Sequence, residues 1–171
     1  SPGVTGLTSG ASLGAVVALF LGWTFAQGWI VPLFAFIGAF AAVGVVYALS
    51  TRAGQTDIAT LLLAGLAVSA FFSALISLMY HFVDDGVLRQ IVYWLMGNLL
   101  GKRWEHVRAL APFVFLGSLG LMAFASDLNI MASGEDEARS LGVSVERTKR
   151  WVLALVSFIA GAGVSVTGMI G

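Results

Sequence analysis

The sequence contains no cysteine, only three prolines and few charges, and these scarcities exclude several classes of protein. Without cysteine there can be no disulfide scaffold, no thiolate metal site and no lipidated cysteine. Charged residues make up 11% of the 171 residues and hydrophobic residues 58%, against roughly 25% and 45–50% in an average soluble domain. A single core of this size could not bury so much apolar surface. A soluble enzyme and a disordered tail are therefore excluded.

The charges that are present balance and cluster. Nine basic and nine acidic residues give a net charge of zero, so no basic surface is expected to attract nucleic acid. Four charge-free stretches are each long enough to cross a membrane as a helix: residues 1–51, 58–83, 109–126 and 151–171. The mean hydropathy of +0.94 agrees with this reading. We expect an all-α, polytopic membrane helical bundle in contact with the lipid bilayer.

Turn signals and charges divide the chain into five spans and three polar parts. The spans are predicted at about 11–27, 31–49, 58–82, 107–126 and 151–171. Residues 1–10, rich in glycine, serine, threonine and proline, are expected to form a loop. Residues 86–97 fit a short amphipathic helix at the membrane surface, outside the core. Residues 127–150 hold nine charges and predict a soluble helical hairpin.

Basic residues set the expected orientation of these parts. Counted by alternation of the spans, five lie on the side of residues 127–150 and three on the other side. Basic loops favour the cytoplasm. The hairpin at 127–150 is therefore expected to be cytoplasmic and the segment at 86–97 periplasmic.

No set of residues has the spacing of a catalytic or cofactor site. His81 and His106 are the only histidines, both at predicted span ends, and an interfacial role is favoured over a metal or proton site because no second ligand stands at metal-site spacing. Residues 97–103 differ from a phosphate-binding loop, with one residue too few between the glycines and no Ser or Thr after the lysine. We expect no catalytic residues, no metal, no cofactor and no nucleotide site.

Small residues recur on one face of the third span, at Gly65, Ser69 and Ser73. Ser9, Gly10 and Ser12 raise the same question near the start of the chain. In lipid, small residues allow helices to approach closely, and hydroxyls can bond across the contact. The alternative is a transport pathway, whose lining needs room and mild polarity. The residues alone leave both interpretations open.

The segment at 127–150 carries signals of a short, well-ended helix. Ser133 is predicted to cap its start, Glu135 and Asp136 suit the helix dipole in the first turn, and Gly142 is predicted to end it. Glu135 and Arg139 have the spacing of an ion pair. Ser144 is predicted to cap a second short helix. The segment is either a solvated loop or a docking element for a soluble partner.

Four stretches together resemble the FecCD-type permeases of ABC transporters, which are type II importers. Residues 128–145, LNIMASGEDEARSLGVSV, are similar to the cytoplasmic coupling segment of that family. Residues 7–14 and 61–70 are similar to parts of its third and fifth helices, and residues 93–97 with Trp104 to the periplasmic segment before its sixth. The resemblance covers essentially the whole chain. It implies the permease fold, with the third to sixth helices and most of the seventh, in a fragment truncated at both ends.

The resemblance implies roles for three groups of residues. The coupling group, which would contact a partner ATPase, comprises Ser133, Gly134, Glu135, Asp136, Ala138, Arg139, Leu141 and Gly142. The pathway group comprises Ser9, Gly10, Ser12, Gly65, Ser69 and Ser73. A cytoplasmic gate would lie near Ile58 and Ala59, where the family's fifth helix begins. Ala138 and Leu141 are expected to offer the apolar contact surface.

The resemblance also implies partners and a cargo. The partners would be a second permease copy, two cytoplasmic ATP-binding subunits that hydrolyse ATP, and a periplasmic or lipid-anchored substrate-binding protein. The setting would be the inner membrane of a bacterial or archaeal cell, and the chain itself would not be an enzyme. The expected cargo is a metal chelate, first an iron–siderophore, with haem, cobalamin or molybdate as alternatives on the same fold.

Two other function classes fit these residues less well. An ion-coupled secondary transporter is expected to carry an ionisable residue near the centre of a span. No charge-free stretch has an acidic or basic residue at its centre. A purely structural membrane scaffold would not need a capped hairpin between two spans. The ABC permease is therefore the preferred interpretation.

Overall fold

The structure, a computed structural model, describes residues 6–22, 29–52, 55–97, 99 and 102–169. Nearly all of these residues are helical. The helices are α1 (Leu7–Phe20), α2 (Ile30–Ser50), α3 (Ile58–Met79), α4 (Asp85–Leu95), α5 (Trp104–Ala123), α6 (Ala125–Met131), α7 (Glu135–Ser140) and α8 (Val145–Thr167). A 3-10 turn, η3 (Tyr80–Phe82), follows α3. Strands β1 (Thr51–Arg52) and β2 (Gln55–Thr56) pair antiparallel over two residues each.

Four helices are long and apolar enough to cross a membrane: α2, α3 continued by η3, α5 and α8. Large apolar side chains stand exposed on their outer faces, among them Leu63 and Phe71 on α3 and Phe115 and Leu116 on α5. Such faces are costly in water and favourable in lipid. The helices therefore have the composition of membrane spans with lipid on their outer sides.

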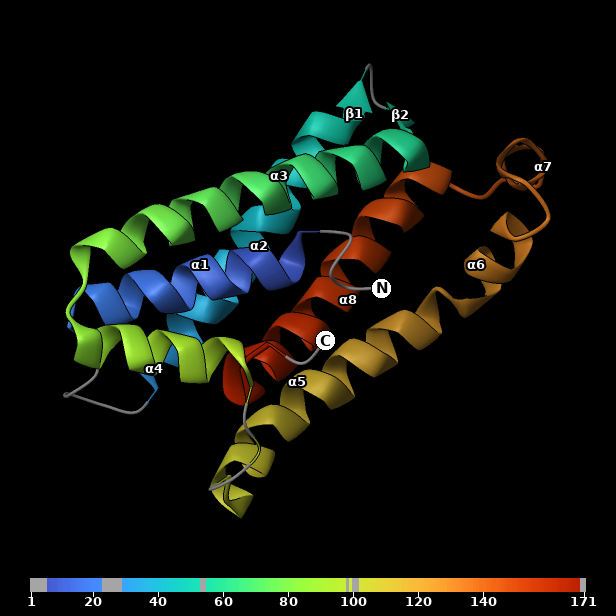
Figure 1. Ribbon diagram of the computed structural model, residues 1–171. Helices are drawn as coiled ribbons and strands as arrows, with labels where there is room; N and C mark the ends of the chain where they lie inside the picture. Colours follow the sequence, from blue (N-terminus) through green and yellow to red (C-terminus); the bar gives the residue numbers. More distant parts are fainter. Residues whose placement is uncertain (1–5, 23–28, 53–54, 98, 100–101, 170–171) are drawn as a thin grey trace.

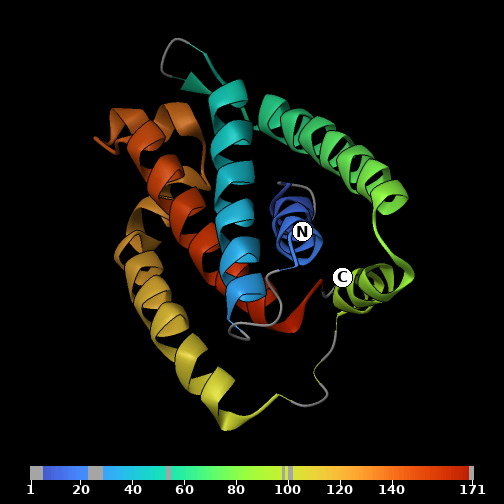
Figure 2. The ribbon, with the colours of Figure 1, turned by 90° about the vertical axis from the view of Figure 1, so that its left-hand side faces the viewer.

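Helix α1 lies in the middle of the bundle (Figure 2). It contacts α2, α3, α4 and α8, whereas α5 lies outside and packs along α8. Most of the apolar core consists of small side chains of α1 and α2, namely Ala11, Ala15, Ala35 and Ala39 with Leu7 and Val43. Alanines bring helix axes close together without leaving voids. The core is thus a contact between backbones more than an interlocking of large side chains.

Glycines make the α1–α2 contact closest. A Cβ on Gly14 would lie 2.8 Å from the carbonyl carbon of Phe34. A Cβ on Gly38 would lie 3.1 Å from the carbonyl carbon of Gly10 and 3.1 Å from the Cα of Gly14. These neighbours are backbone atoms, which cannot rotate away. Only glycine fits at Gly14 and Gly38 while the two helices keep this separation.

The first and last predicted spans are shifted from their expected positions. A loop was expected over residues 1–10, but α1 begins at Leu7 and ends at Phe20, where the prediction was 11–27. Part of that span, residues 23–27, lies outside the described residues. The last span was expected at 151–171, but α8 already begins at Val145. The charges at 146–150 therefore belong to the first turns of a long helix and not to a second short helix of a hairpin.

The middle spans lie closer to their predicted positions, whereas α4 packs differently from the prediction. Helix α2 begins one residue before the predicted 31–49, and α5 begins three residues before the predicted 107–126. The segment at 86–97 does form a helix, α4. The prediction that this helix lies outside the core was wrong. Ile91 is fully buried in a cluster with Val16 and Leu19 of α1 and Ile76 of α3. Its apolar face, with Val87, Trp94 and Leu95 beside Ile91, therefore packs against the bundle.

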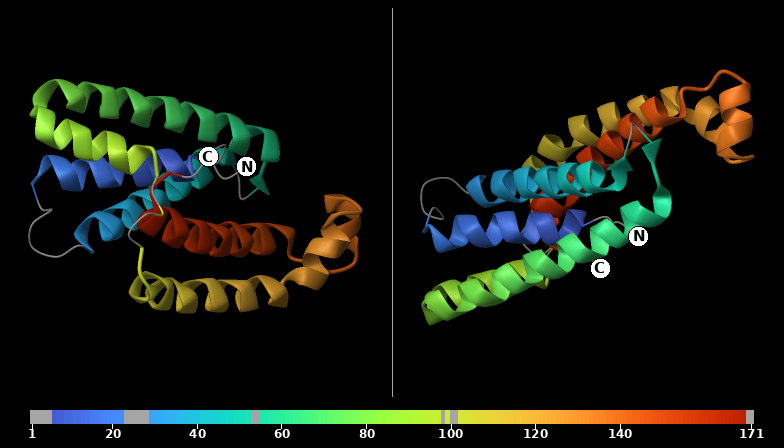
Figure 3. Two further views of the ribbon diagram at one scale, coloured as in Figure 1. Left: turned by 60° about the horizontal axis from the view of Figure 1, so that its bottom comes forward. Right: turned by 90° about the horizontal axis from the view of Figure 1, so that it is seen from above.

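Different elements of the protein gather at the two ends of the bundle. The β1–β2 ladder, α6, α7 and the start of α8 gather at one end (Figures 1 and 3). At the other end of α8, Gly168 meets the backbone after α4, where a Cβ would lie 3.0 Å from the Cα of Gly97. Helix α8 therefore runs from the charged end of the protein to the region of α4.

Candidate functional site

Helix α7 is a short helix at the charged end of the bundle, and backbone hydrogen bonds fix its C-terminus. The predicted cap at Ser133 is wrong, because the residue before the helix is Gly134 and no side chain caps it. The backbone N–H of Ser133 instead donates to Ile130 O at 3.1 Å, which closes the end of α6. The predicted end at Gly142 is correct. Its φ of 85° lies in the left-handed region that glycine tolerates.

Two backbone hydrogen bonds complete this end of α7. The N–H of Val143 donates to Ala138 O at 3.0 Å, and the N–H of Gly142 donates to Arg139 O at 3.1 Å. This pair of bonds is the Schellman motif, which satisfies carbonyls that a helix end leaves free. The predicted apolar surface is only half correct. Leu141 is 70% exposed, but Ala138 is fully buried and therefore cannot form part of an exposed contact surface.

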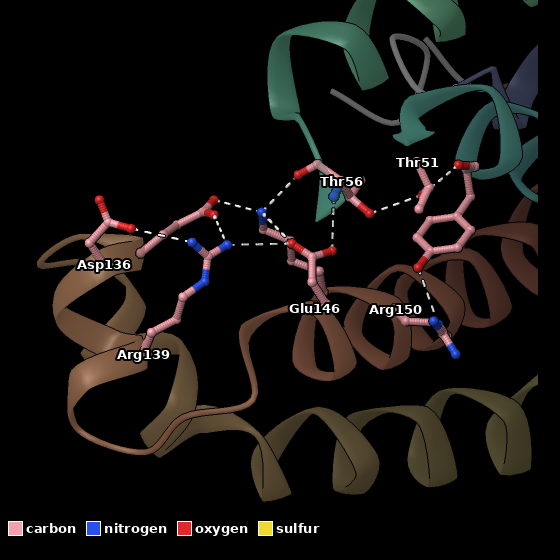
Figure 4. Close-up of polar contacts among 9 residues, drawn as sticks. Thr51, Thr56, Asp136, Arg139, Glu146 and Arg150 are labelled. Carbon is pink, nitrogen blue, oxygen red and sulfur yellow. Dashed lines mark hydrogen bonds and ion pairs between the residues drawn. The ribbon is translucent and has the colours of Figure 1, made fainter. Parts of the chain in front are cut away.

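Arg139 stands among three carboxylates (Figure 4). Its guanidinium lies 3.7 Å from Glu135, 3.3 Å from Asp136 and 3.9 Å from Glu146 of α8. The Glu135 contact is the pair that the sequence predicts. The Arg139 side chain is 41% exposed. Water screens these pairs, so they orient α7 more than they stabilise it.

Lys149 is the more buried cation of this end, with 11% of its side chain exposed. Its Nζ lies 2.7 Å from Glu135 Oε1 and 3.5 Å from Glu146 Oε1. The same ammonium donates to the backbone carbonyl of Thr56 at 2.9 Å. Glu135 Oε1 and Thr56 O lie within hydrogen-bond distance of the ammonium, whereas Glu146 Oε1 forms only a longer ion pair with it and has no hydrogen-bond partner. Lys149 therefore joins α7, α8 and β2 at one point.

Glu146 makes the second connection from α8 to β2. Its Oε2 accepts a hydrogen bond from the backbone N–H of Thr56 at 2.9 Å. Thr56 is itself held to Thr51, with 3.0 Å between their hydroxyl oxygens. Since the Thr51 hydroxyl already donates to Tyr47 O, the Thr56 hydroxyl is the donor in that pair. We call Thr51, Thr56, Glu135, Asp136, Arg139, Glu146 and Lys149 together the polar end.

Helix α3 begins immediately after this contact. Asp57 caps it, with one carboxylate oxygen accepting from the Thr60 hydroxyl at 2.7 Å and from the Thr60 N–H at 2.8 Å. These hydrogen bonds to Thr60, the hydroxyl first, hold the pKa of Asp57 below its ordinary value. The expected gate residues Ile58 and Ala59 follow as the first two residues of α3, and both are exposed.

A cleft of about 680 Å³ lies between the start of α3 and α7. Ile58 lines it from one side, and Glu135 and Arg139 line it from the other. One expected gate residue, Ile58, and two expected coupling residues, Glu135 and Arg139, thus face one cavity although they are far apart in the sequence. The floor of that cavity includes Thr56 and Glu146.

The expected pathway residues do not share one surface within this chain. Gly10 and Ser12 of α1 and Gly65 of α3 are buried, and Gly10 belongs to the α1–α2 contact. The Ser9 hydroxyl lies 3.1 Å from the hydroxyl of Ser69, joining α1 to α3. Ser73 is exposed. Close helix packing therefore accounts for most of the group, and Ser73 is the member left facing outward.

Neither histidine lies in a cluster of metal ligands. Among the described residues, no group of three or more His, Asp or Glu side chains is placed to hold a metal ion. His106 Nδ1 accepts from the Arg103 N–H at 3.2 Å, and its ring lies 5.5 Å from that of Trp29. His106 thus closes the start of α5.

Sequence reasoning missed Glu146, Lys149 and Thr56 as parts of the site. The i,i+3 spacing of Glu146 and Lys149 was a local signal for a shared helix face. Their contacts with Thr56 span 90 and 93 positions, which no local pattern reveals. Arg150 is a further link, because its Nε donates to the Tyr47 hydroxyl at 3.2 Å and ties α8 to α2.

Apolar helices of membrane length, packed through glycine and alanine and ending in a structured charged cluster, define an integral membrane helical bundle. The chain matches the FecCD transport family over residues 1–171. It belongs to that family.

The relatives and a solved structure agree with this assignment. The chain is 44% identical to the cobalamin import system permease protein BtuC of Halobacterium salinarum, over 99% of this chain and 45% of the relative. It is 34% identical to the hemin transport system permease protein HmuU of Yersinia pestis, over 99% and 52%. A structure described as an inward-facing conformation of a metal-chelate type ABC transporter matches with a TM-score of 0.88 at 29% identity, over 100% of this chain and 54% of that one.

These matches confirm the predicted fold class, an all-α membrane bundle with the ABC permease fold. The chain spans about half the length of the curated relatives it matches.

Proposed function

We propose that this chain is part of the membrane-spanning permease subunit of an ABC importer that moves a metal chelate across the cell membrane. The observation that carries the proposal is α7. This helix is ended by backbone hydrogen bonds, is tied to α8 and presents the exposed side chain of Leu141. A short, rigid helix can transmit the movement of a partner protein, whereas a flexible solvated loop would deform instead. Membership of the FecCD transport family supports the same function.

The partners follow from this role. A second permease copy completes the membrane pathway, two cytoplasmic ATP-binding subunits dock on α7, and a periplasmic or lipid-anchored binding protein delivers the cargo. Hydrolysis of ATP resides in the docked subunits, so the permease itself is not an enzyme. The polar end faces the cytoplasm, in agreement with the basic residues of 127–150.

The cargo is a metal chelate, and the relatives order the candidates. The sequence alone favoured an iron–siderophore. The relative at 44% identity is named for cobalamin import and the one at 34% for hemin transport. Cobalamin is therefore the first substrate to assay, followed by haem and a ferric siderophore.

The activity is tested with the full-length permease reconstituted in proteoliposomes with its ATP-binding subunits and binding protein. Uptake of labelled cobalamin, haem and a ferric siderophore is measured with and without ATP on the side of the ATP-binding subunits. We expect ATP-dependent accumulation of one chelate. Accumulation that needs an ion gradient and ignores ATP would replace the importer with a secondary transporter.

The docking role of α7 is tested with Leu141→Asp. Adding charge at the exposed tip should abolish co-purification of the ATP-binding subunits, and ATPase activity and uptake should be lost together. Ala138 is unsuitable for this test, because a large side chain at that buried position would disrupt α7 itself. Leu99→Asp is the matched control, since Leu99 is 66% exposed and lies far from α7 in the sequence. Normal co-purification of the Leu141→Asp permease would refute the docking role.

The pathway is proposed to follow the outward face of α3 at Ser73, with Ile58 and Ala59 at its cytoplasmic gate. Ser9 and Ser69 support this wall through the hydrogen bond between α1 and α3, Gly65 is buried on α3, and Gly10 and Ser12 keep their packing roles on α1. Ser73→Trp should block uptake while the complex still assembles. Leu78→Trp, at another exposed position of α3, is the control. Equal uptake by both variants would place the pathway elsewhere.

A further inference from the structure

Thr56 is held by α8 through both of its backbone groups. Its N–H donates to Glu146 Oε2 at 2.9 Å, and its carbonyl accepts from Lys149 Nζ at 2.9 Å. Thr56 is buried, and its hydroxyl is bonded to Thr51 across the β1–β2 ladder. The two side chains that hold it come from successive turns of one helix face. A backbone held from both sides follows any movement of that face.

The position of Thr56 determines where α3 begins. Asp57, the next residue, caps α3 through its two hydrogen bonds with Thr60. No flexible linker separates the two, so a displacement of Thr56 carries the first turn of α3 with it. Ile58 and Ala59, the proposed gate, lie in that turn.

The same two side chains also contact α7. Lys149 Nζ lies 2.7 Å from Glu135, and Glu146 lies 3.9 Å from Arg139. Across the described residues, no hydrogen bond or ion pair joins α7 directly to residues 51–60, and the 680 Å³ cleft lies between them. The polar connection from α7 to α3 therefore passes through Glu146 and Lys149.

Burial makes this connection stiffer than the contacts of Arg139. The exposed fractions of the Lys149 and Glu146 side chains are 11% and 24%, against 41% for Arg139. Breaking a partly buried pair leaves an uncompensated charge, which is more costly than losing a surface pair.

We propose that Glu146 and Lys149 form a clamp on Thr56 that transmits movement of α7 to the gate at the start of α3. They are positioning residues, since neither touches cargo or nucleotide. The inference rests on the proposed function and adds to it the residues through which docking at α7 reaches the pathway. It also gives the β1–β2 ladder a role, as the element that the clamp grips.

The clamp is tested with Lys149→Met in the reconstituted full complex. Methionine keeps an unbranched side chain only one atom shorter and removes the charge and the donors. We expect the ATP-binding subunits to co-purify and hydrolyse ATP, while uptake per ATP hydrolysed falls by roughly tenfold. Arg147→Met is the matched control, because Arg147 is an exposed cation two positions earlier on α8, and in the described part of the chain no hydrogen bond or ion pair joins it to Thr56 or α7. It should couple normally.

A second variant separates transmission from general damage. Glu146→Gln keeps an acceptor for the Thr56 N–H but loses the charge facing Lys149 and Arg139, so a smaller loss of coupling is expected. The movement itself is followed by the distance between spin labels on Ala59 of α3 and on Leu33, an exposed residue near the far end of α2 that lies outside the clamp. This distance should change on ATP binding in wild type and Arg147→Met, and should stay fixed in Lys149→Met.

The outcomes separate the inference from the function on which it rests. Wild-type coupling and label movement in Lys149→Met, with Leu141→Asp inactive as expected, would overturn the clamp and leave the importer standing. Absence of ATP-dependent uptake in the wild-type complex would overturn the proposed function and the clamp with it. Uncoupled hydrolysis with an immobile gate label in Lys149→Met would support both.

Discussion

The α1–α2 interface and the polar end both hold helices together, but they do so with different chemistry. Between α1 and α2, glycine positions bring backbone atoms into direct contact, and nothing there can rearrange. At the polar end, five charged side chains share several partners at distances from 2.7 to 3.9 Å. The first contact fails at the addition of one methyl group. In the second, the exposed ion pairs of Arg139 can rearrange while the more buried contacts of Lys149 hold, which suits a part that must move as a unit.

The largest effect is expected from Gly38→Ala. The added Cβ would meet backbone of Gly10 and Gly14, so the helices must separate, at a cost of roughly 3 kcal/mol. Gly44→Ala on the same helix is the control. A Cβ there meets nothing within 4 Å, and the change should be neutral or slightly stabilising. Thermal unfolding of the full-length permease in detergent measures both, and equal melting temperatures would remove the contrast between the two regions.

Gly142→Val should have the next largest effect. A non-glycine residue at a φ of 85° costs roughly 1–2 kcal/mol, and the Schellman end of α7 should loosen. Amide hydrogen exchange should become faster over residues 135–145 and stay unchanged in α1 and α2. Gly86→Val in α4 is the control, because Gly86 has open space around it and no positive φ. Faster exchange throughout the bundle would mean that the polar end is not an independent unit.

Arg139→Gln should have a small effect on stability. The side chain is 41% exposed, so its three ion pairs together should contribute no more than about 1 kcal/mol, and less at high salt. The measurement is the melting temperature at low and high ionic strength. Lys149→Met provides the comparison, because its more buried contacts should respond less to salt. A large, salt-independent loss in Arg139→Gln would show that the polar end is as intolerant as the glycine contact.

The smallest effect is expected from the titration of Asp57. Thr60 favours the charged carboxylate, so the folded pKa lies below the ordinary value of 3.8. The stabilisation is present above that ordinary value and is lost as the pH falls through the lower, folded pKa. The difference in melting temperature between wild type and Asp57→Asn should therefore shrink as the pH is lowered from neutral through this range. A difference that grows on acidification would reverse the sign of the shift.

Local features of the polar end could be predicted from the sequence. The end of α7 at Gly142 and the pairing of Glu135 with Arg139 depend on residues within one or two turns, and the structure contains both. The clamp could not be predicted, because Lys149 and Thr56 meet only after α2, α3 and α8 have packed. The cap at Ser133 failed for a similar reason. The end of α6 already uses the backbone of Ser133, and α6 was not predicted as a separate helix.

Helices defined by long apolar runs could be predicted from the sequence. Helix ends that depend on contacts between small residues were predicted less well. The spans α2, α3 and α5 follow from runs that contain no charge or few charges. The start of α1 was misread because glycine and serine were taken as turn signals. In a membrane bundle these residues build contacts instead, and the hydroxyls of Ser9 and Ser12 bond back to the carbonyls of Gly6 and Thr8 within the helix. The charges at the start of α8 were misread in the opposite sense, as a loop.

Helix α8 has a mechanical consequence that follows from its length alone. Its 23 residues form an uninterrupted rod, about 35 Å long at roughly 1.5 Å per residue. One end carries Glu146 and Lys149, and beyond the other end Gly168 abuts the backbone at Gly97. A tilt of about 5° about one end of such a rod displaces the other end by roughly 3 Å. Helix α8 therefore acts as a lever arm, and the two faces of the membrane are joined by a single stiff element.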